Sequence, residues 1–101
     1  MITCFLRDEI DSAKIQEFEH RGRLWIGLVN RLDGKHHGYL LPSKSASDIA
    51  LASFTFPSMS AYEAYRHKAA DDPECKAAIA YAKETGCLRR WQQSFFRPVF
   101  E

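Results

Sequence analysis

The sequence lacks a strong charge of either sign. Fourteen Lys and Arg residues nearly balance thirteen Asp and Glu residues, which leaves a formal net charge of +1 at pH 7. Proteins that bind nucleic acid through its phosphates carry a clear basic excess. Only Arg89, Arg90 and Trp91 suggest such binding, and the arginine pair is typical of a solvated strand edge. We therefore expect no nucleic-acid partner.

Long apolar runs and cysteine pairs are also missing. No run approaches the length of about 18 residues that spans a bilayer, so we expect no membrane partner. Cys4, Cys75 and Cys87 form no C-x-x-C pair and leave an odd thiol, which favours reduced, buried cysteines. Residues 1–5 enter a predicted strand without a charged leader region or cleavage site. These features together predict a cytoplasmic protein.

Motifs for catalysis or cofactor binding are absent from the sequence. There is no serine nucleophile motif, no G-x-G-x-x-G and no phosphate-cradling loop. The adjacent pair His36-His37 lies in a predicted strand, where neighbouring side chains face opposite ways and cannot chelate one metal together. No Cys or carboxylate stands at ligand spacing from them. We expect neither a metal nor another cofactor.

Apolar and aromatic residues, in contrast, are plentiful. They make up 46% of the 101 residues and include seven Phe, four Tyr and two Trp. This length predicts one domain spanning residues 1–101. A chain this short buries only about two-thirds of its unfolded surface, so part of the apolar material is expected to lie outside the core of a single subunit.

The first half of the chain predicts a strand, a long helix and a second strand. Residues 2–10 alternate, with Ile2, Cys4 and Leu6 on one side. Asp11 is a suitable N-cap for a helix whose apolar stripe runs from Ile15 through Trp25 to Val29, and Gly34 suits the left-handed position after it. Residues 36–42 follow as a strand with His37, Tyr39 and Leu41 on one face.

The second half predicts a strand buried on both faces, a broken helix and a last strand. Residues 43–48 form a hairpin loop, and residues 49–56 are apolar or small on both sides, which is typical of a strand covered twice. Ser60 and Glu63 match a capping box, Asp72-Pro73 starts a second helical segment, and Gly86 ends it. The chain then extends from residue 87 to residue 100.

This order of elements predicts a ferredoxin-like βαββαβ fold, an α+β domain with an antiparallel four-stranded sheet. The helices cover one face only. Each large apolar side chain left in water on the other face would forfeit about 1.5–3 kcal/mol, so we expect that face to pair with a second copy. Arg90 and Gln92 are expected at the rim of this homodimer interface.

Several blocks in the same order resemble the NIPSNAP family, in the form of its short bacterial members: LWIGLVNR (24–31), GKHHGYLLP (34–42), FTFPSMSAYEAY (54–65), DPEC (72–75) and SFFRPVF (94–100). The resemblance implies the dimeric α/β barrel, in which two ferredoxin-like sheets close against each other. It implies no settled activity. Haem-degrading members of the wider superfamily are associated with a pattern that includes an Asn on the first strand. The first strand here has Thr3, Arg7 and Asp8 but no Asn, which argues against haem degradation.

The candidate site residues come from the strands and helices that would enclose a small pocket: Trp25, His37, Tyr39, Tyr62, Tyr65 and Arg97. Trp25, Tyr62 and Tyr65 lie in helical stripes, where a core role is the commoner one. A neutral imidazole acts as a base near pH 7, which makes His37 the candidate catalytic residue. Arg97 suits an anionic ligand and equally an ion pair at a dimer interface.

Two functions remain open on the sequence. The first is a homodimeric module that binds a small apolar or aromatic molecule or another partner. The second is a cofactor-independent monooxygenase or isomerase, with His37 as base, Tyr39 and Trp25 lining the pocket, and Arg97 or Tyr65 holding a polar group. The aromatic interior and the absence of a complete catalytic set favour the first.

Overall fold

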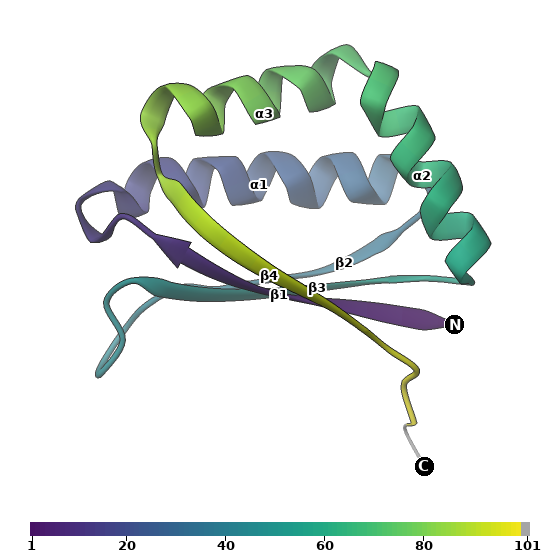
Figure 1. The fold of residues 1–101 in the computed structure, drawn as a ribbon, viewed down its shortest axis with the longest axis horizontal. Helices are drawn as coiled ribbons and strands as arrows, with labels where there is room; N and C mark the ends of the chain where they lie inside the picture. Colours follow the sequence, from purple (N-terminus) through teal and green to yellow (C-terminus); the bar gives the residue numbers. More distant parts are fainter. Residues whose placement is uncertain (100–101) are drawn as a thin grey trace.

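The computed structural model describes residues 1–99, which form an antiparallel four-stranded sheet with helices packed on one face (Figure 1). The sheet order is β2-β3-β1-β4. The elements are β1 (Ile2–Ile10), a short 3-10 turn (Ser12–Lys14), α1 (Ile15–Arg31), β2 (Lys35–Leu40), β3 (Ile49–Phe56), α2 (Met59–Asp71), α3 (Pro73–Thr85) and β4 (Leu88–Phe96). The predicted α+β ferredoxin-like fold is confirmed.

The first helix begins and ends close to its predicted bounds, but its end differs in detail. The Asp11 carboxylate accepts a hydrogen bond from the Ala13 amide (3.0 Å), as an N-cap does. At the other end Asp33, rather than Gly34, adopts the left-handed conformation (φ 73°). Gly34 is needed for space instead, because a Cβ there would lie 2.5 Å from the Phe56 ring.

The second strand contains a bulge that its sequence pattern did not predict. Gly38 has φ 96°, and the pairing with β3 shifts register between His36 and Tyr39. An extra residue in one strand reverses the alternation beyond it. His36 and Tyr39 therefore both face the helices, opposite Phe54 and Ala52, and the prediction that His37 shares a face with Tyr39 is wrong.

The helices of the second half begin at strong caps. Ser58 caps α2 by accepting a hydrogen bond from the Ala61 amide (3.1 Å), so the predicted capping box at Ser60 lies two residues too late. Asp72 caps α3 as predicted, and Gly86 closes it with φ 65°. The last strand ends at Phe96, before the predicted limit at residue 100, which lies outside the described residues.

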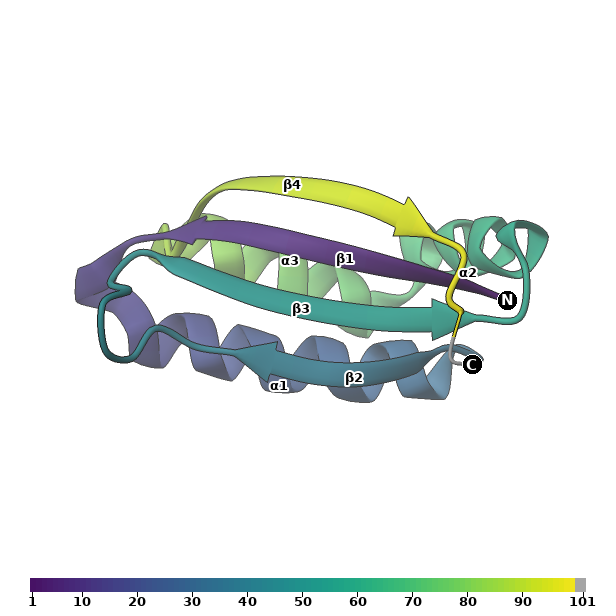
Figure 2. The same ribbon diagram turned by 90° about the horizontal axis from the view of Figure 1, so that it is seen from below.

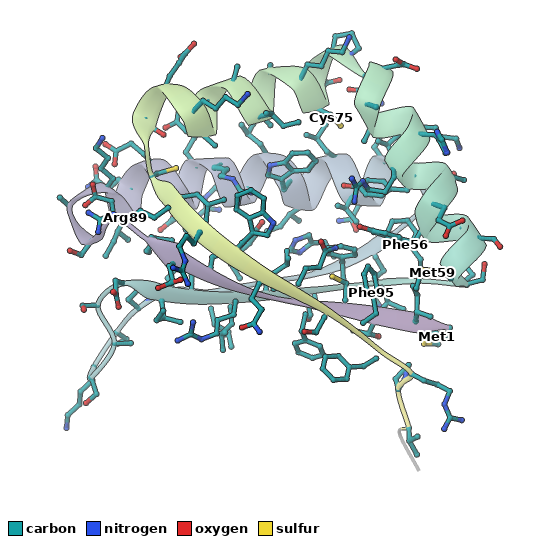
Figure 3. The ribbon with its side chains drawn as sticks, viewed as in Figure 1. Met1, Phe56, Met59, Cys75, Arg89 and Phe95 are labelled. Carbon is teal, nitrogen blue, oxygen red and sulfur yellow. The ribbon has the colours of Figure 1, made fainter. Side chains whose placement is uncertain are left out.

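The two faces of the sheet differ in their cover, as Figure 2 shows from the uncovered side. Toward the helices, β1 and β3 bury Cys4, Ala50, Phe54 and Phe56. Figure 3 shows Phe56 and Phe95 reaching toward α2 from β3 and β4. The opposite face carries large apolar side chains that no helix covers: Phe5 (50% exposed), Leu51 (42%) and Phe96 (53%). The third strand is apolar or small on both faces as predicted, but only the face toward the helices is buried, so the burial of both faces stays a prediction.

None of the helices within residues 1–99 is both long and apolar enough to cross a membrane.

Candidate functional site

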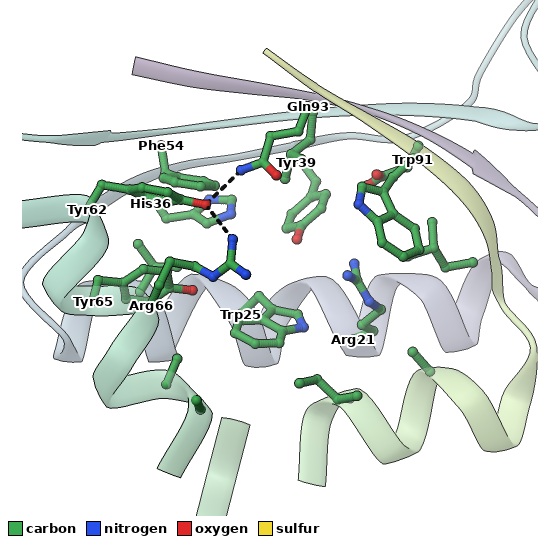
Figure 4. Close-up of a pocket in the computed structure, with 18 of the residues that line it drawn as sticks. Arg21, Trp25, His36, Tyr39, Phe54, Tyr62, Tyr65, Arg66, Trp91 and Gln93 are labelled. Atoms are coloured by element: carbon green, nitrogen blue, oxygen red, sulfur yellow. Dashed lines mark hydrogen bonds between the residues drawn. The ribbon is translucent and has the colours of Figure 1, made fainter. Parts of the chain in front are cut away.

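A pocket of about 580 Å³ lies between the helical layer and the inner face of the sheet (Figure 4). The helices contribute Trp25 and Arg21 from α1, Tyr65 from α2 and Ala82 from α3. Trp91 on β4 lines the mouth and is 64% exposed. The volume falls within the range of small-molecule sites, about 300–1,000 Å³, and the lining is mostly apolar and aromatic, as in such sites.

The end of the pocket beneath α2 is aromatic, and the Tyr62 hydroxyl at this end is hydrogen-bonded within the protein. Tyr62 stacks on Phe54 (ring centroids 6.1 Å apart) and meets Tyr65 at 5.9 Å. The Tyr62 hydroxyl accepts hydrogen bonds from Arg66 Nη1 (3.1 Å) and Gln93 Nε2 (2.9 Å), drawn as dashed lines in Figure 4. These contacts tie α2 to the last strand and give this end a structural role.

His36 lines the pocket beside Phe54 in a neutral form. Its backbone amide donates to Asn30 Oδ1 (2.9 Å), and its ring Nδ1 accepts from the Gly38 amide (2.9 Å), so Nε2 carries the proton. The ring stacks on Tyr39 at 5.0 Å. Burial, and then the neighbouring His37, lowers the pKa of His36 to about 4. This imidazole is therefore a hydrogen-bond donor rather than a base at neutral pH.

The other end of the pocket contains buried polar atoms that have no partner among residues 1–99. They are Asp8 Oδ2, Arg21 Nε and Nη1, and Trp25 Nε1. Asp8 is only 1% exposed, and its burial raises the pKa of the carboxyl to about 6 although the positive charge of Arg21 opposes the shift. Burial likewise raises the pKa of Tyr39 to about 12. A buried polar atom without a partner costs about 1–3 kcal/mol, which makes this end unusual for a purely structural region.

Four of the six predicted site residues line this pocket: Trp25, Tyr39, Tyr62 and Tyr65. His37 does not, because the bulge at Gly38 turns its ring to the outer face, where Nε2 lies 2.7 Å from Thr55 Oγ1. Arg97 is exposed beyond the end of β4 and also lies outside the pocket lining. The structure thus separates these two residues from the other candidates.

The polar residues that line the pocket were not among the predicted site residues, although two of them are recognisable in the sequence pattern. Asp8 is in phase with Ile2, Cys4 and Leu6, so an acid was visible on the apolar side of the first strand. Arg21 falls between Phe18 and Trp25 at helical spacing in the apolar stripe. His36 had no such signal, because its direction depends on the bulge.

Arg89 and Arg90 lie on the exposed side of the molecule, away from the pocket. Arg89 points outward in Figure 3 and lies 3.7 Å from the Asp11 carboxylate. Arg90 lies 3.0 Å from Glu9. Their positive charges are thus matched by local acids. Within residues 1–99, no group of three His, Cys, Asp or Glu side chains is placed to hold a metal ion.

The NIPSNAP family model matches residues 7–100, nearly the whole chain. The chain belongs to the NIPSNAP family. The resemblance of its sequence blocks is thereby confirmed. No curated protein matches the sequence.

Solved structures share the fold of this NIPSNAP chain at low sequence identity. A NIPSNAP domain protein from Burkholderia xenovorans is 17% identical, with a TM-score of 0.80 over 99% of this chain and 96% of that one. A NIPSNAP family protein from Agrobacterium tumefaciens is 18% identical, with a TM-score of 0.81 over 98% and 93%. A Nitrosomonas europaea protein, assigned provisionally to the antibiotic biosynthesis monooxygenases, is 9% identical, with a TM-score of 0.73 over 99% and 100%. At these identities the likeness concerns the fold alone.

Proposed function

We propose that this NIPSNAP protein is a homodimer in which each subunit binds a small aromatic or apolar molecule in the pocket between its helices and its sheet. The observation that carries the proposal is the pocket of about 580 Å³, aromatic and apolar over most of its lining, with unpartnered polar atoms at one end. Sites for small molecules combine such a lining with a few polar groups that orient the ligand.

Binding is tested by filling the pocket from α3. Ala82 lines the pocket, and Ala80 is exposed on the same helix outside the lining. The uncharged probe naphthalene carboxamide is titrated against the protein while tryptophan fluorescence is followed, since Trp25 and Trp91 both line the pocket. We expect saturable binding that Ala82→Phe abolishes and Ala80→Phe preserves. Equal binding by the two variants would reject the pocket as the site.

The outer face of the sheet supports pairing with a second copy. Phe5, Leu51 and Phe96 are exposed there and border a hollow of about 430 Å³, with Arg7 and Gln92 beside them. Burying such side chains is worth about 1.5–3 kcal/mol each, a large fraction of a net stability of about 5–15 kcal/mol. A self-complementary patch of this kind suits a two-fold dimer, and Gln92 lies beside the apolar centre.

The dimer is tested by placing a charge at the centre of this face. Leu51→Glu is expected to halve the molar mass measured by light scattering at micromolar concentration. Leu24→Glu is the control, because Leu24 is a comparably exposed leucine on α1, in the helical layer. A wild-type mass of one chain, or a dimer that survives Leu51→Glu, would contradict the proposed interface.

A second candidate function is proton abstraction, the first step of a cofactor-independent isomerase or monooxygenase. It is favoured by Asp8, whose carboxyl has a pKa of about 6 and an unpartnered Oδ2. A general base works best when its pKa lies near the working pH. Asp8 would take a proton from the carbon beside a substrate carbonyl, and Arg21 and Trp25 would stabilise the resulting enolate oxygen. In this scheme Asp8 replaces His37 as the base.

The enzymatic candidate is tested by hydrogen–deuterium exchange. Benzoylacetone, an aromatic diketone, is incubated with the protein in heavy water, and loss of its acidic C–H signal is followed by NMR. The candidate requires exchange that is faster with the wild-type protein than with Asp8→Asn. If both proteins exchange the probe at the rate of buffer alone, the binding function stands without this activity.

A further inference from the structure

We propose that the natural ligand is a planar aromatic carboxylate, and that its carboxylate is received by Arg21 and Trp25 at the polar end of the pocket. The inference rests on the proposed binding function and specifies the chemical class of the ligand.

The unpartnered atoms at this end are mostly donors. Arg21 Nε, Arg21 Nη1 and Trp25 Nε1 are buried N–H groups, and none has an acceptor among residues 1–99. Figure 4 shows the Arg21 and Trp25 side chains projecting from α1 toward the space beneath the sheet. Arginine and indole nitrogens donate and never accept. A ligand that satisfies them would therefore bring acceptor atoms, such as the oxygens of a carboxylate.

The charges around the pocket favour an anion over a neutral acceptor. The lining contains three basic side chains, Arg21, Arg66 and Lys83, and one acidic side chain, Asp8. Asp8 is mostly ionised at neutral pH even with its pKa raised to about 6, so it offsets one of these three positive charges and leaves the lining basic. Hydrogen bonds to a charged acceptor are about twice as strong as neutral ones, especially where water is excluded.

The rest of the lining selects a flat, apolar body for this ligand. Trp25, Tyr39, Phe54 and Trp91 line the same space and present ring faces and edges. Aromatic rings stack or meet edge to face at separations of about 4.5–7 Å. The mouth beside the exposed Trp91 gives the ligand a route from solvent. One end of the molecule would then be charged and buried, and the other would be aromatic.

The test compares three probes with one ring system and different head groups: naphthalene carboxylate, naphthalene carboxamide and naphthylmethylammonium. Affinities are measured by calorimetry at neutral pH. We expect the carboxylate to bind at least about tenfold more tightly than the carboxamide, since each tenfold step corresponds to about 1.4 kcal/mol, and the ammonium to bind most weakly. Arg21→Gln should remove the carboxylate preference. Arg23→Gln should keep it, because Arg23 is exposed on the same helix and pairs with Glu19 (2.8 Å).

A second variant covers the case in which Arg21→Gln fails to fold, as judged by circular dichroism. Asp8→Asn removes the one negative charge of the lining, so it should strengthen carboxylate binding by about threefold or more and leave carboxamide binding nearly unchanged. Equal affinities for carboxylate and carboxamide, or a preference for the ammonium, would overturn the inference and leave the pocket intact. If none of the three probes binds, the proposed binding function itself fails.

Discussion

At the α2 end of the pocket, the Tyr62 hydroxyl is hydrogen-bonded to Arg66 and Gln93, and the surrounding rings pack on one another. At the polar end, Asp8 and Arg21 have buried polar atoms that form no hydrogen bond with any of residues 1–99. Both ends lie on the same sheet and beneath the same helical layer. The contrast indicates that the first end stabilises the fold, whereas the second keeps polar groups at an energetic cost that a ligand would relieve.

The largest expected difference between the two ends is in the stability that is lost when an aromatic ring is removed from each. Phe56 is 1% exposed beneath α2, and Phe56→Ala is expected to lower the free energy of unfolding by about 3–5 kcal/mol, through lost burial and a cavity. Trp91→Ala, at the open mouth, should change it by less than about 1 kcal/mol. Urea unfolding curves measure both. A loss of several kcal/mol in Trp91→Ala would show that the mouth is part of the core.

A second prediction compares Gly34, which packs against Phe56 beneath α2, with Gly27, which has open space around it on α1. A Cβ at Gly34 would lie 2.5 Å from the Phe56 ring and 2.7 Å from Val29, so Gly34→Ala is expected to destabilise by about 1–3 kcal/mol. Gly27 on α1 has nothing within 4 Å of such a Cβ. Gly27→Ala should stabilise by about 0.5–1 kcal/mol, because alanine favours a helix. Thermal melts check both, and equal effects would contradict the tight packing at Gly34.

The third prediction concerns the pH dependence of stability, to which Asp8 and His36 contribute with opposite signs. The folded-state pKa of Asp8 is raised to about 6, so the folded state holds the extra proton and stability falls as pH rises from about 4 to about 6. His36 has a folded-state pKa lowered to about 4, so the unfolded state holds the extra proton and stability rises with pH over a similar window. In the wild-type protein the two effects oppose each other.

Asp8→Asn removes one side of this balance. Between about pH 4 and 6, the free energy of unfolding of the variant should rise with pH more steeply than that of the wild type. His36 alone then sets this slope, which is at most about 1.4 kcal/mol per pH unit for one group. It should also be the more stable protein near neutral pH. Asp71→Asn, which changes an exposed carboxyl on α2, serves as the control and should keep the wild-type slope. Identical slopes in all three proteins would show that Asp8 is not titrating as a buried group.

The elements with strong local signals were predicted closely. The strands at residues 2–10 and 49–56 have their predicted bounds, because their side chains alternate or are apolar throughout. Asp72, Pro73 and Gly86 set the limits of α3 for reasons that lie within a few residues of each end. The element order then left few topologies, and the observed sheet is the predicted one.

The site was predicted less well, because it depends on contacts between distant residues. Because of the bulge at Gly38, His36 and not His37 faces the pocket together with Tyr39. The regular alternation of side chains along a strand, on which the prediction was based, cannot reveal a bulge. Trp91 reaches the mouth through the pairing of β4 with β1, where it lies opposite Asp8, more than eighty positions earlier in the chain. Asp8 and Arg21 were visible as polar residues in apolar stripes, but only packing of α1 on the sheet brings them together.

The most direct measurement uses the two tryptophans of the chain, Trp25 and Trp91, which both line the pocket. Their indole N–H groups give two separate signals in a proton–nitrogen correlation spectrum. Titration with naphthalene carboxylate is expected to move both signals, and that of Trp25 more strongly as its N–H gains an acceptor. Saturation that leaves both indole signals in place, with shifts confined to residues such as Phe5 and Leu51 on the outer face, would contradict a ligand site beneath the helices.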